Sequence, residues 1–333
     1  MSQNKENEQL FDVVGVGNAI VDVIAEVEDA FIEKQNLVKG SMSLVSAERS
    51  AELYAEMPTG TEMPGGSAAN TMVGVAQLGG SAAYIGKISE DYLGQVFREG
   101  MSKAEVSFSF GIDKDLPTAR CLIQVTPDAQ RTMNTFLGVS AYLSSEDVSQ
   151  ELVASSELLY CEGYLWDTDD SKEAIRKAMK ISKSSNRKVA LALSDTFCVE
   201  RHREDWLELL REFVDYIFCN EKEICALYMT EDLGEAIEKV SKNVDVAFIT
   251  LGSRGSLVVE DSKIIEIEAV PVKGVVDSTG AGDIFASGVI FGMSRKLPFK
   301  KCAEMGSLMA SEVITSLGPR IENDPKELVE HLL

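Results

Sequence analysis

The segment D-S-T-G-A-G-D at residues 277–283 stands directly before a helical pattern of small and apolar residues. Gly280 and Gly282 let the backbone approach an anion closely. The N–H groups of this turn, including those of Ala281 and Asp283, would point at one anion, and the positive end of the helix dipole would reinforce them. Asp283 lies in the first turn, where it could accept the proton of an attacking hydroxyl group. The segment therefore predicts a phosphoryl-transfer site, although Asp283 could instead only stabilise the helix start.

A second glycine pair lies upstream, in P-G-G-S-A-A-N at residues 64–70. Gly65 and Gly66 open a predicted helix that is crowded with serine and alanine. A close backbone approach suits a polyol ligand, and the Asn70 carboxamide can both donate to and accept from neighbouring hydroxyl groups. The alternative is a loop that packs a helix tightly on a sheet.

The arrangement of helical and apolar segments predicts an α/β fold. From residue 145 onward, helical patterns alternate with short apolar strands, which is typical of a mostly parallel sheet covered on both faces. Earlier β-prone segments alternate polar and apolar residues and fit such a sheet poorly, so we expect them to form a small separate sheet, a lid. No repeat or linker is visible. We expect a single domain over residues 1–333, with the lid built from about 20–45 and 105–136.

Composition narrows the class of protein. Lys and Arg number 32 and Asp and Glu 54, a net charge of −22 over 333 residues. So acidic a surface repels nucleic acids and anionic membranes, and we expect neither as a partner. The N-terminal residues 1–10 are polar and contain no apolar signal core. The 6 cysteines form no C-x-x-C pair and there are 2 histidines, so we expect no zinc site, reduced thiols and a cytoplasmic protein.

A motif of another nucleotide-binding class is incomplete in this sequence. The segment G-V-G-N-A-I at 15–20 begins like a dinucleotide fingerprint, but Ile20 stands where the third glycine is needed. A dehydrogenase is therefore a distant alternative, which binding of NADH would test.

Together, G-G-x-x-x-N and the downstream D-[ST]-x-G-A-G-D resemble both signatures of the ribokinase (PfkB) family of carbohydrate kinases. The resemblance spans essentially the whole chain. It implies a ribokinase-like three-layer α/β/α fold with a mostly parallel central sheet and a small β-sheet lid. It also implies an ATP-dependent kinase that uses Mg²⁺ with ATP and is often activated by K⁺, here near Asp277 and residues 310–318. In this resemblance Asp283 is the catalytic base and the amides of Gly280 to Asp283 form the anion hole.

The resemblance extends to the nucleotide side of the site. Asn220 and Glu223 match an N-x-x-E motif in which the glutamate organises magnesium through water. The same two residues could simply form a helix capping box. Thr250, Gly252 and Gly255 match the strand end and loop beside the nucleotide, or else a plain hairpin turn.

On the acceptor side, the resemblance implies that Asn18 and Asp22 hydrogen-bond sugar hydroxyls. Asp22 stands among apolar residues, where an unpaired carboxylate is costly, so we expect it to have a polar partner. The alternative for Asp22 is a satisfied polar residue at the edge of a strand.

Three stretches are most similar to adenosine kinases within this family: residues 15–23, 130–143 and 191–203. The resemblance implies that Arg131 faces a phosphate and that Phe197 stacks on adenine, with Phe136 and Tyr164 as further walls of the base site. Aromatic faces stack on purines, whereas a free sugar needs mainly hydroxyl partners. Core packing is the alternative for each aromatic residue, and a surface salt bridge is the alternative for Arg131.

The leading hypothesis is a kinase that phosphorylates the 5′-hydroxyl of a ribonucleoside, adenosine above all, in purine salvage. A ribokinase- or fructokinase-like sugar kinase is the first alternative. A catalytically idle nucleoside- or sugar-binding protein of the same fold is the second. The expected partners are ATP and a nucleoside or sugar, and the expected assembly is a monomer or a homodimer.

Overall fold

The computed structural model describes residues 11–128 and 130–333. The expectation that the N-terminal segment contains no signal core concerns residues 1–10, and these lie outside the described residues. Among the helices of the described part, none is both long and apolar enough to cross a bilayer.

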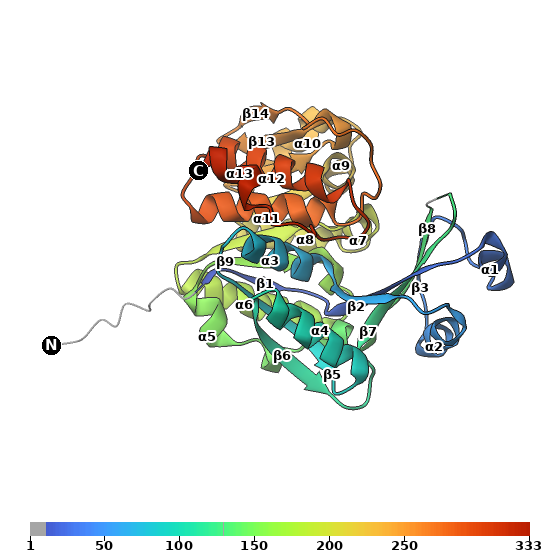
Figure 1. The fold of residues 1–333 in the computed structure, drawn as a ribbon. Coiled ribbons are helices and arrows are strands. Elements are labelled where there is room, and N and C mark those ends of the chain that lie inside the picture. Colours follow the sequence, from blue (N-terminus) through green and yellow to red (C-terminus); the bar gives the residue numbers. More distant parts are fainter. Residues whose placement is uncertain (1–10, 129) are drawn as a thin grey trace.

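One large sheet runs through the middle of the protein (Figure 1). Its strands are β1 (Phe11–Val16), β5 (Ala82–Ser89), β6 (Ser107–Asp113), β9 (Ser156–Glu162), β10 (Lys188–Ala192), β11 (Tyr216–Asn220), β12 (Val246–Thr250), β13 (Ser256–Glu260) and β14 (Lys263–Ile267). The nine strands lie in the order β14-β13-β12-β11-β10-β9-β1-β5-β6. All neighbours from β12 to β6 pair in parallel, and β13 and β14 add antiparallel strands at one edge. The mostly parallel central sheet is therefore confirmed.

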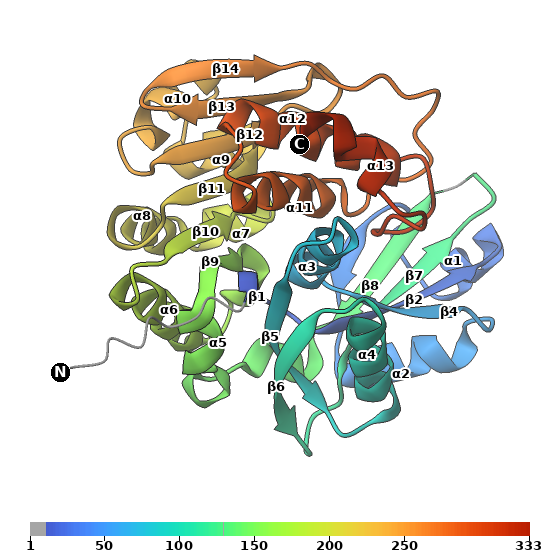
Figure 2. The same ribbon diagram turned by 60° about the vertical axis from the view of Figure 1, so that its left-hand side comes forward.

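Helices cover both faces of this sheet (Figure 2). One face carries α5 (Gln150–Ser155), α6 (Asp169–Ser184), α7 (Thr196–Arg201), α8 (Arg203–Glu212), α9 (Glu221–Tyr228) and α10 (Leu233–Val240). The opposite face carries α3 (Ser67–Gln77), α4 (Tyr92–Lys103), α11 (Ala281–Ser294) and α12 (Phe299–Val313), with α13 (Lys326–Val329) packed outside them. Trp166 and Trp206 are buried in the first layer, and Met72 and Phe285 in the second. The three-layer α/β/α arrangement is therefore confirmed.

A second, five-stranded sheet projects from one side of the large one (Figure 1). Its strands are β2 (Ile20–Glu26), β3 (Met42–Leu44), β4 (Thr61–Gly65), β7 (Ala119–Val125) and β8 (Arg131–Phe136), in the order β3-β8-β7-β2-β4. The helices α1 (Asp29–Lys34) and α2 (Ala47–Glu56) lie beside it. Short 3-10 helices occupy Gly138–Tyr142, Ser145–Asp147, Gly163–Leu165, Gly252–Arg254 and Glu330–Leu332.

The small sheet differs from the expected lid in two strands. Strand β4 was not expected, because Pro64 disfavours a strand; the structure accommodates the proline by placing β4 at the sheet edge. Strand β6, expected in the lid, instead pairs with β5 in the large sheet. Because β6 is an edge strand of that sheet, its side chains remain half-buried, which explains the alternating pattern that suggested a lid strand.

Close packing of α3 against α11 brings two helix N-termini together. A Cβ atom on Gly74 of α3 would lie 2.4 Å from the Ser287 Oγ of α11, so only glycine permits this approach. The first turns of the two helices carry the motifs at 64–70 and 277–283. The fold therefore places the two glycine motifs side by side.

Candidate active site

A cavity of about 1000 Å³ lies at the carboxyl ends of the parallel strands, next to the small sheet. Residues that follow the large-sheet strands line it, among them Asn18 after β1 and Glu162 at the end of β9. Met42, Ile123 and Met133 line it from the small sheet. Open α/β sheets bind ligands at this edge where the strand order reverses, and here β1 lies between β9 and β5.

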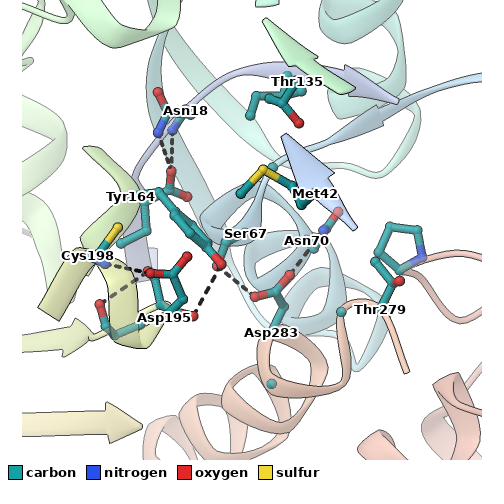
Figure 3. Close-up of a pocket in the computed structure, with 18 of the residues that line it drawn as sticks. Asn18, Met42, Ser67, Asn70, Thr135, Tyr164, Asp195, Cys198, Thr279 and Asp283 are labelled. Carbon is teal, nitrogen blue, oxygen red and sulfur yellow. Dashed lines mark hydrogen bonds between the residues drawn. The ribbon is translucent and has the colours of Figure 1, made fainter. Parts of the chain in front are cut away.

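Asp283 lies where α11 faces α3, and it accepts two hydrogen bonds from α3 (Figure 3). Ser67 Oγ donates to Asp283 Oδ1 at 2.7 Å, and Asn70 Nδ2 donates to Oδ2 at 3.1 Å. Burial raises the pKa of Asp283 to about 6, against these hydrogen bonds and the charge of Arg320, which lower it. A carboxylate with this pKa is ionised at neutral pH and can still accept a proton, as a general base must.

The turn before α11 presents unpaired amides beside Asp283. Gly280 has a φ of 76° and its Cβ position is filled by Pro319, so its conformation and packing both require glycine. In the described part of the chain the amides of Gly280, Gly282 and Asp283 have no acceptor. The Ala281 amide differs from the expected arrangement, because it donates to Ser278 O at 3.2 Å. The remaining donors lie at a helix N-terminus, which attracts anions.

Asp22 faces the cavity from β2 of the small sheet. Gly65 on the neighbouring strand gives it room, since a Cβ there would lie 2.3 Å from Asp22 Oδ2. Burial raises the pKa of Asp22 to about 7, while Arg320 and Arg131 lower it. Asp22 has no hydrogen-bond partner within residues 11–128 and 130–333, so the polar partner that we expected is not found there; Arg320 and Arg131 act on it through their charges.

Asn18 is held by a carboxylate that the sequence did not single out. Glu162 accepts hydrogen bonds from Asn18 N at 2.7 Å and Asn18 Nδ2 at 2.9 Å, and from Ala68 N at 2.7 Å. Burial raises the pKa of Glu162 to about 7, although these three hydrogen bonds lower it. Glu162 thus joins the ends of β1 and β9 to the start of α3. Its position at a predicted strand end was the signal available in the sequence.

Arg131 contacts the loop before α11 and does not line the cavity. Its Nη1 lies 2.7 Å from Asp277 Oδ2 and 3.3 Å from Thr279 Oγ1. Arg131 therefore forms a salt bridge, but a buried one rather than the surface salt bridge that we weighed as the alternative. Asp277 also accepts from the amides of Thr279 and Gly318, so the carboxylate near which a K⁺ ion was expected already has a cationic partner.

The expected aromatic residues separate into two groups. Tyr164 and Phe197 line the cavity. Tyr164 Oη donates to Ser194 O at 3.2 Å, and the Arg201 guanidinium lies 4.3 Å from the centre of the Phe197 ring. Phe136 does not line the cavity. The adjacent residues Thr135 and Leu137 line the cavity. Because side chains alternate between the two faces of a strand, Phe136 points to the opposite face.

Of the residues expected beside the nucleotide, Asn220, Glu223 and Thr250 line the cavity. Asn220 and Glu223 form the capping box at the start of α9, in which Glu223 accepts from Asn220 N at 2.9 Å. Gly252 and Gly255 do not line the cavity. Gly255 has a φ of 89° and packs against Ile267 O, so it serves the turn between β12 and β13.

The acidic groups here fit a magnesium ion that arrives with phosphates. Glu223 and Asp195, at the start of α7, both line the cavity, and neither forms an ion pair within the described residues. Burial raises the pKa of Glu223 to about 7, and the charge of Asp195 raises it further. In that same part of the chain, no cluster of three or more His, Cys, Asp or Glu side chains could hold a metal alone. Mg²⁺ commonly keeps waters and binds through one or two carboxylates and the substrate phosphates.

The fold is of the ribokinase-like class, and comparison with known proteins agrees. The model of the pfkB family of carbohydrate kinases matches residues 13–326. The chain therefore belongs to the pfkB family of carbohydrate kinases. It is an ATP-dependent kinase.

Three similar proteins refine this placement. The structure of an adenosine kinase from Sinorhizobium meliloti is 42% identical, with a TM-score of 0.90 over 97% of this chain and 100% of the other. That of a probable sugar kinase from Rhizobium etli CFN 42 is 39% identical, with a TM-score of 0.91 over 98% and 100%. Adenosine kinase 2 of Arabidopsis thaliana is 24% identical over 92% of this chain and 94% of its own. The chain is thus adenosine kinase-like within the family.

Proposed function

We propose that this kinase transfers the γ-phosphate of ATP to the 5′-hydroxyl of a ribonucleoside, with adenosine as the preferred acceptor. The observation that carries the proposal is the placement of Asp283. It lies on the cavity wall, fixed by Ser67 and Asn70, beside helix amides that have no acceptor of their own. A base and an anion-binding turn at one point are what phosphoryl transfer requires.

In this mechanism Asp283 accepts the proton of the 5′-hydroxyl as its oxygen attacks the γ-phosphorus. The bond from that phosphorus to the β–γ bridging oxygen breaks, and ADP leaves. The amides of Gly280, Gly282 and Asp283 hold the charge of the moving phosphoryl group. When bound, Mg²⁺ neutralises phosphate charge, and Glu223 and Asp195 would hold it through water. A K⁺ ion near Asp277 would lie beside a carboxylate that already pairs with Arg131.

The acceptor end of the cavity supports a nucleoside rather than a free sugar. Asp22 and Asn18 offer polar groups near Asp283, as a ribose requires. Tyr164 and Phe197 contribute aromatic surface to the cavity, and the small sheet contributes the apolar side chains of Ile20, Met42, Leu44, Ile123 and Met133. Such a surface suits a purine ring and offers little to a sugar alone. We propose that the small sheet closes over the acceptor and excludes water.

A sugar acceptor is the second candidate, favoured by the 39% identity to the probable sugar kinase from Rhizobium etli. An idle binding protein is disfavoured, because Asp283 and the glycine turn are intact. We further expect a cytoplasmic enzyme, since all 6 cysteines are free thiols. A role in purine salvage would follow from adenosine as the acceptor.

The direct test is release of ADP from Mg-ATP with adenosine, inosine, guanosine, ribose or fructose as the acceptor. The proposal expects the highest kcat/KM with adenosine. A preference for a free sugar would leave the roles of Asp283 and the neighbouring amides unchanged. It would contradict the assignment of Phe197 and Tyr164 to a binding site for the base. No acceptor-dependent ADP release would contradict the proposal as a whole.

A further inference from the structure

Arg320 lies in the C-terminal segment that closes the back of the phosphate-binding turn. The preceding residues fix this segment: Gly318 N donates to Asp277 Oδ2 at 2.9 Å, and Pro319 fills the space beside Gly280. The Arg320 backbone is therefore anchored to the same loop that precedes α11. The sequence analysis did not single out this arginine.

The Arg320 side chain reaches Asp283 through one intervening carboxamide. Arg320 Nε donates to Asn70 Oδ1 at 2.9 Å, and Asn70 Nδ2 donates to Asp283 Oδ2 at 3.1 Å. A guanidinium can only donate, so it engages the oxygen end of the carboxamide and turns the NH₂ end toward the carboxylate. Asn70 itself is 4% exposed and has no solvent-facing alternative.

Arg320 is also the positive charge that acts on both acidic groups of the acceptor site. Its charge lowers the pKa of Asp283 and of Asp22, and burial lowers its own pKa to about 10, which leaves it charged at neutral pH. Its Nη2 is buried and has no hydrogen-bond partner in the part of the chain that the structure describes. The groups that face Asp283 from the packed elements are Ser67 and Asn70 of α3, Asp22 of β2, Tyr160 and Glu162 of β9, Tyr164 after β9, and Arg320.

We propose that Arg320 is a positioning residue for phosphoryl transfer: it turns the Asn70 carboxamide toward Asp283 and supplies the positive charge beside Asp22 and Asp283. The inference rests on the proposed function, because it needs Asp283 as the base. Arg320 does not line the cavity, so it acts through Asn70 and through its charge.

The test compares Arg320→Met, which removes both charge and donors, with Arg320→Lys, which keeps the charge. Arg98→Gln, an exposed arginine on α4, is the matched control and should behave like the wild type. The readout is the pH profile of kcat/KM and kcat with Mg-ATP and the acceptor that gives the highest turnover. For Arg320→Met we expect the acid limb of the pH profile to shift to a pH about 1 unit higher, because the carboxylate of Asp283 has lost a nearby positive charge. We also expect kcat to fall by about 10- to 100-fold.

Arg320→Lys should keep the wild-type acid limb and still lose turnover, because an ammonium cannot hold the carboxamide as the planar guanidinium does. If Arg320→Met folds and the acid limb of its pH profile stays at the wild-type position, the inference is overturned. This holds even if the melting temperature of Arg320→Met falls. If Arg320→Met does not fold, Arg320→Lys provides the test. A wild-type kcat in Arg320→Lys would overturn the positioning role. A reduced kcat with an unchanged acid limb of the pH profile would support it.

Asp283→Asn, assayed in parallel, separates this inference from the proposed function. If Asp283→Asn keeps near-wild-type turnover, the base assignment itself is wrong. If Asp283→Asn is inactive while Arg320→Met resembles the wild type, only the role of Arg320 is wrong.

Discussion

Arg131 of the small sheet and Asp277 of the loop before α11 form a buried ion pair, with Nη1 and Oδ2 2.7 Å apart. Both side chains are nearly inaccessible, 9% and 5% exposed. The pair therefore fastens the small sheet to the loop that binds phosphate in the proposed mechanism. Arg131 Nη2 is buried and has no hydrogen-bond partner in the described residues.

Arg131→Gln should lower the free energy of unfolding by about 3–5 kcal/mol, because it leaves Asp277 buried without its cationic partner. Urea denaturation followed by the fluorescence of the buried Trp166 and Trp206 measures this change. Arg131→Gln combined with Asp277→Asn should be less destabilised than the single variant, since no unpaired charge remains. A loss below about 1 kcal/mol in the single variant would show that the pair contributes little.

Gly282→Ala separates phosphate binding from folding. A Cβ atom at Gly282 would have no neighbour within 4 Å, so the unliganded protein should melt like the wild type. The added methyl group would stand where a phosphate approaches the amides, so KM for ATP should rise at least tenfold, a cost of about 1.4 kcal/mol. An unchanged KM for ATP would mean that the phosphate does not approach this turn.

The pH dependence of the reaction follows from two carboxylates that burial holds near neutrality. Asp283 has a pKa of about 6 and Asp22 of about 7. Asp283 must be ionised to accept a proton, and Asp22 accepts stronger hydrogen bonds from hydroxyl groups when it is ionised. We expect kcat/KM to rise with pH through 6 to 7 and to fall below that range, with apparent values that belong to the coupled pair. A profile that stays flat from about pH 5 to pH 8 would contradict the ionisation requirement.

Stability of the unliganded protein should change in the opposite direction over the same range. The folded pKa values of Asp22, Glu162, Glu223 and Asp283 are raised above the unfolded ones, so the folded state binds more protons in this window. The free energy of unfolding should therefore decrease as pH rises from about 4 to 7. Thermal melts at each pH supply this control and exclude unfolding as the cause of the acid limb.

Phe197→Ala should weaken nucleoside binding by about 1–3 kcal/mol if its ring stacks on a base. Phe136→Ala is the matched control, because Phe136 does not line the cavity and should leave KM for the nucleoside unchanged. Steady-state KM values for adenosine with both variants give the comparison. Equal KM values in the wild type and Phe197→Ala would remove Phe197 from the acceptor site.

The contrast between these two phenylalanines shows where sequence reasoning stops. The glycine motifs could be recognised because their chemistry is local: each is a short turn that opens a helix. The orientation of Phe136 depends on the pairing register of β8, and that strand was not expected as an element. One residue of register decides whether a side chain faces the cavity or the opposite side.

Residues that act across the fold were also missed. Arg320 and Asn70 are hydrogen-bonded across a separation of 250 residues, and Glu162 holds Asn18 across 144. No local pattern marks such pairs, because only the folded sheet brings the strand ends together. The prediction that β6 belongs to the small sheet was wrong for a related reason. An edge strand of a buried sheet has the same alternating pattern of polar and apolar residues as a strand of an exposed sheet.

The most direct test of the central claim is to follow the reaction of Mg-ATP with adenosine by ³¹P NMR, using the wild type and Asp283→Asn. The account predicts that the wild type forms one adenosine 5′-phosphate for each ADP. Asp283→Asn should melt like the wild type but react about 10²- to 10⁴-fold more slowly, because it lacks the base. Inorganic phosphate in place of a phosphorylated nucleoside, or near-wild-type turnover in Asp283→Asn, would contradict the account.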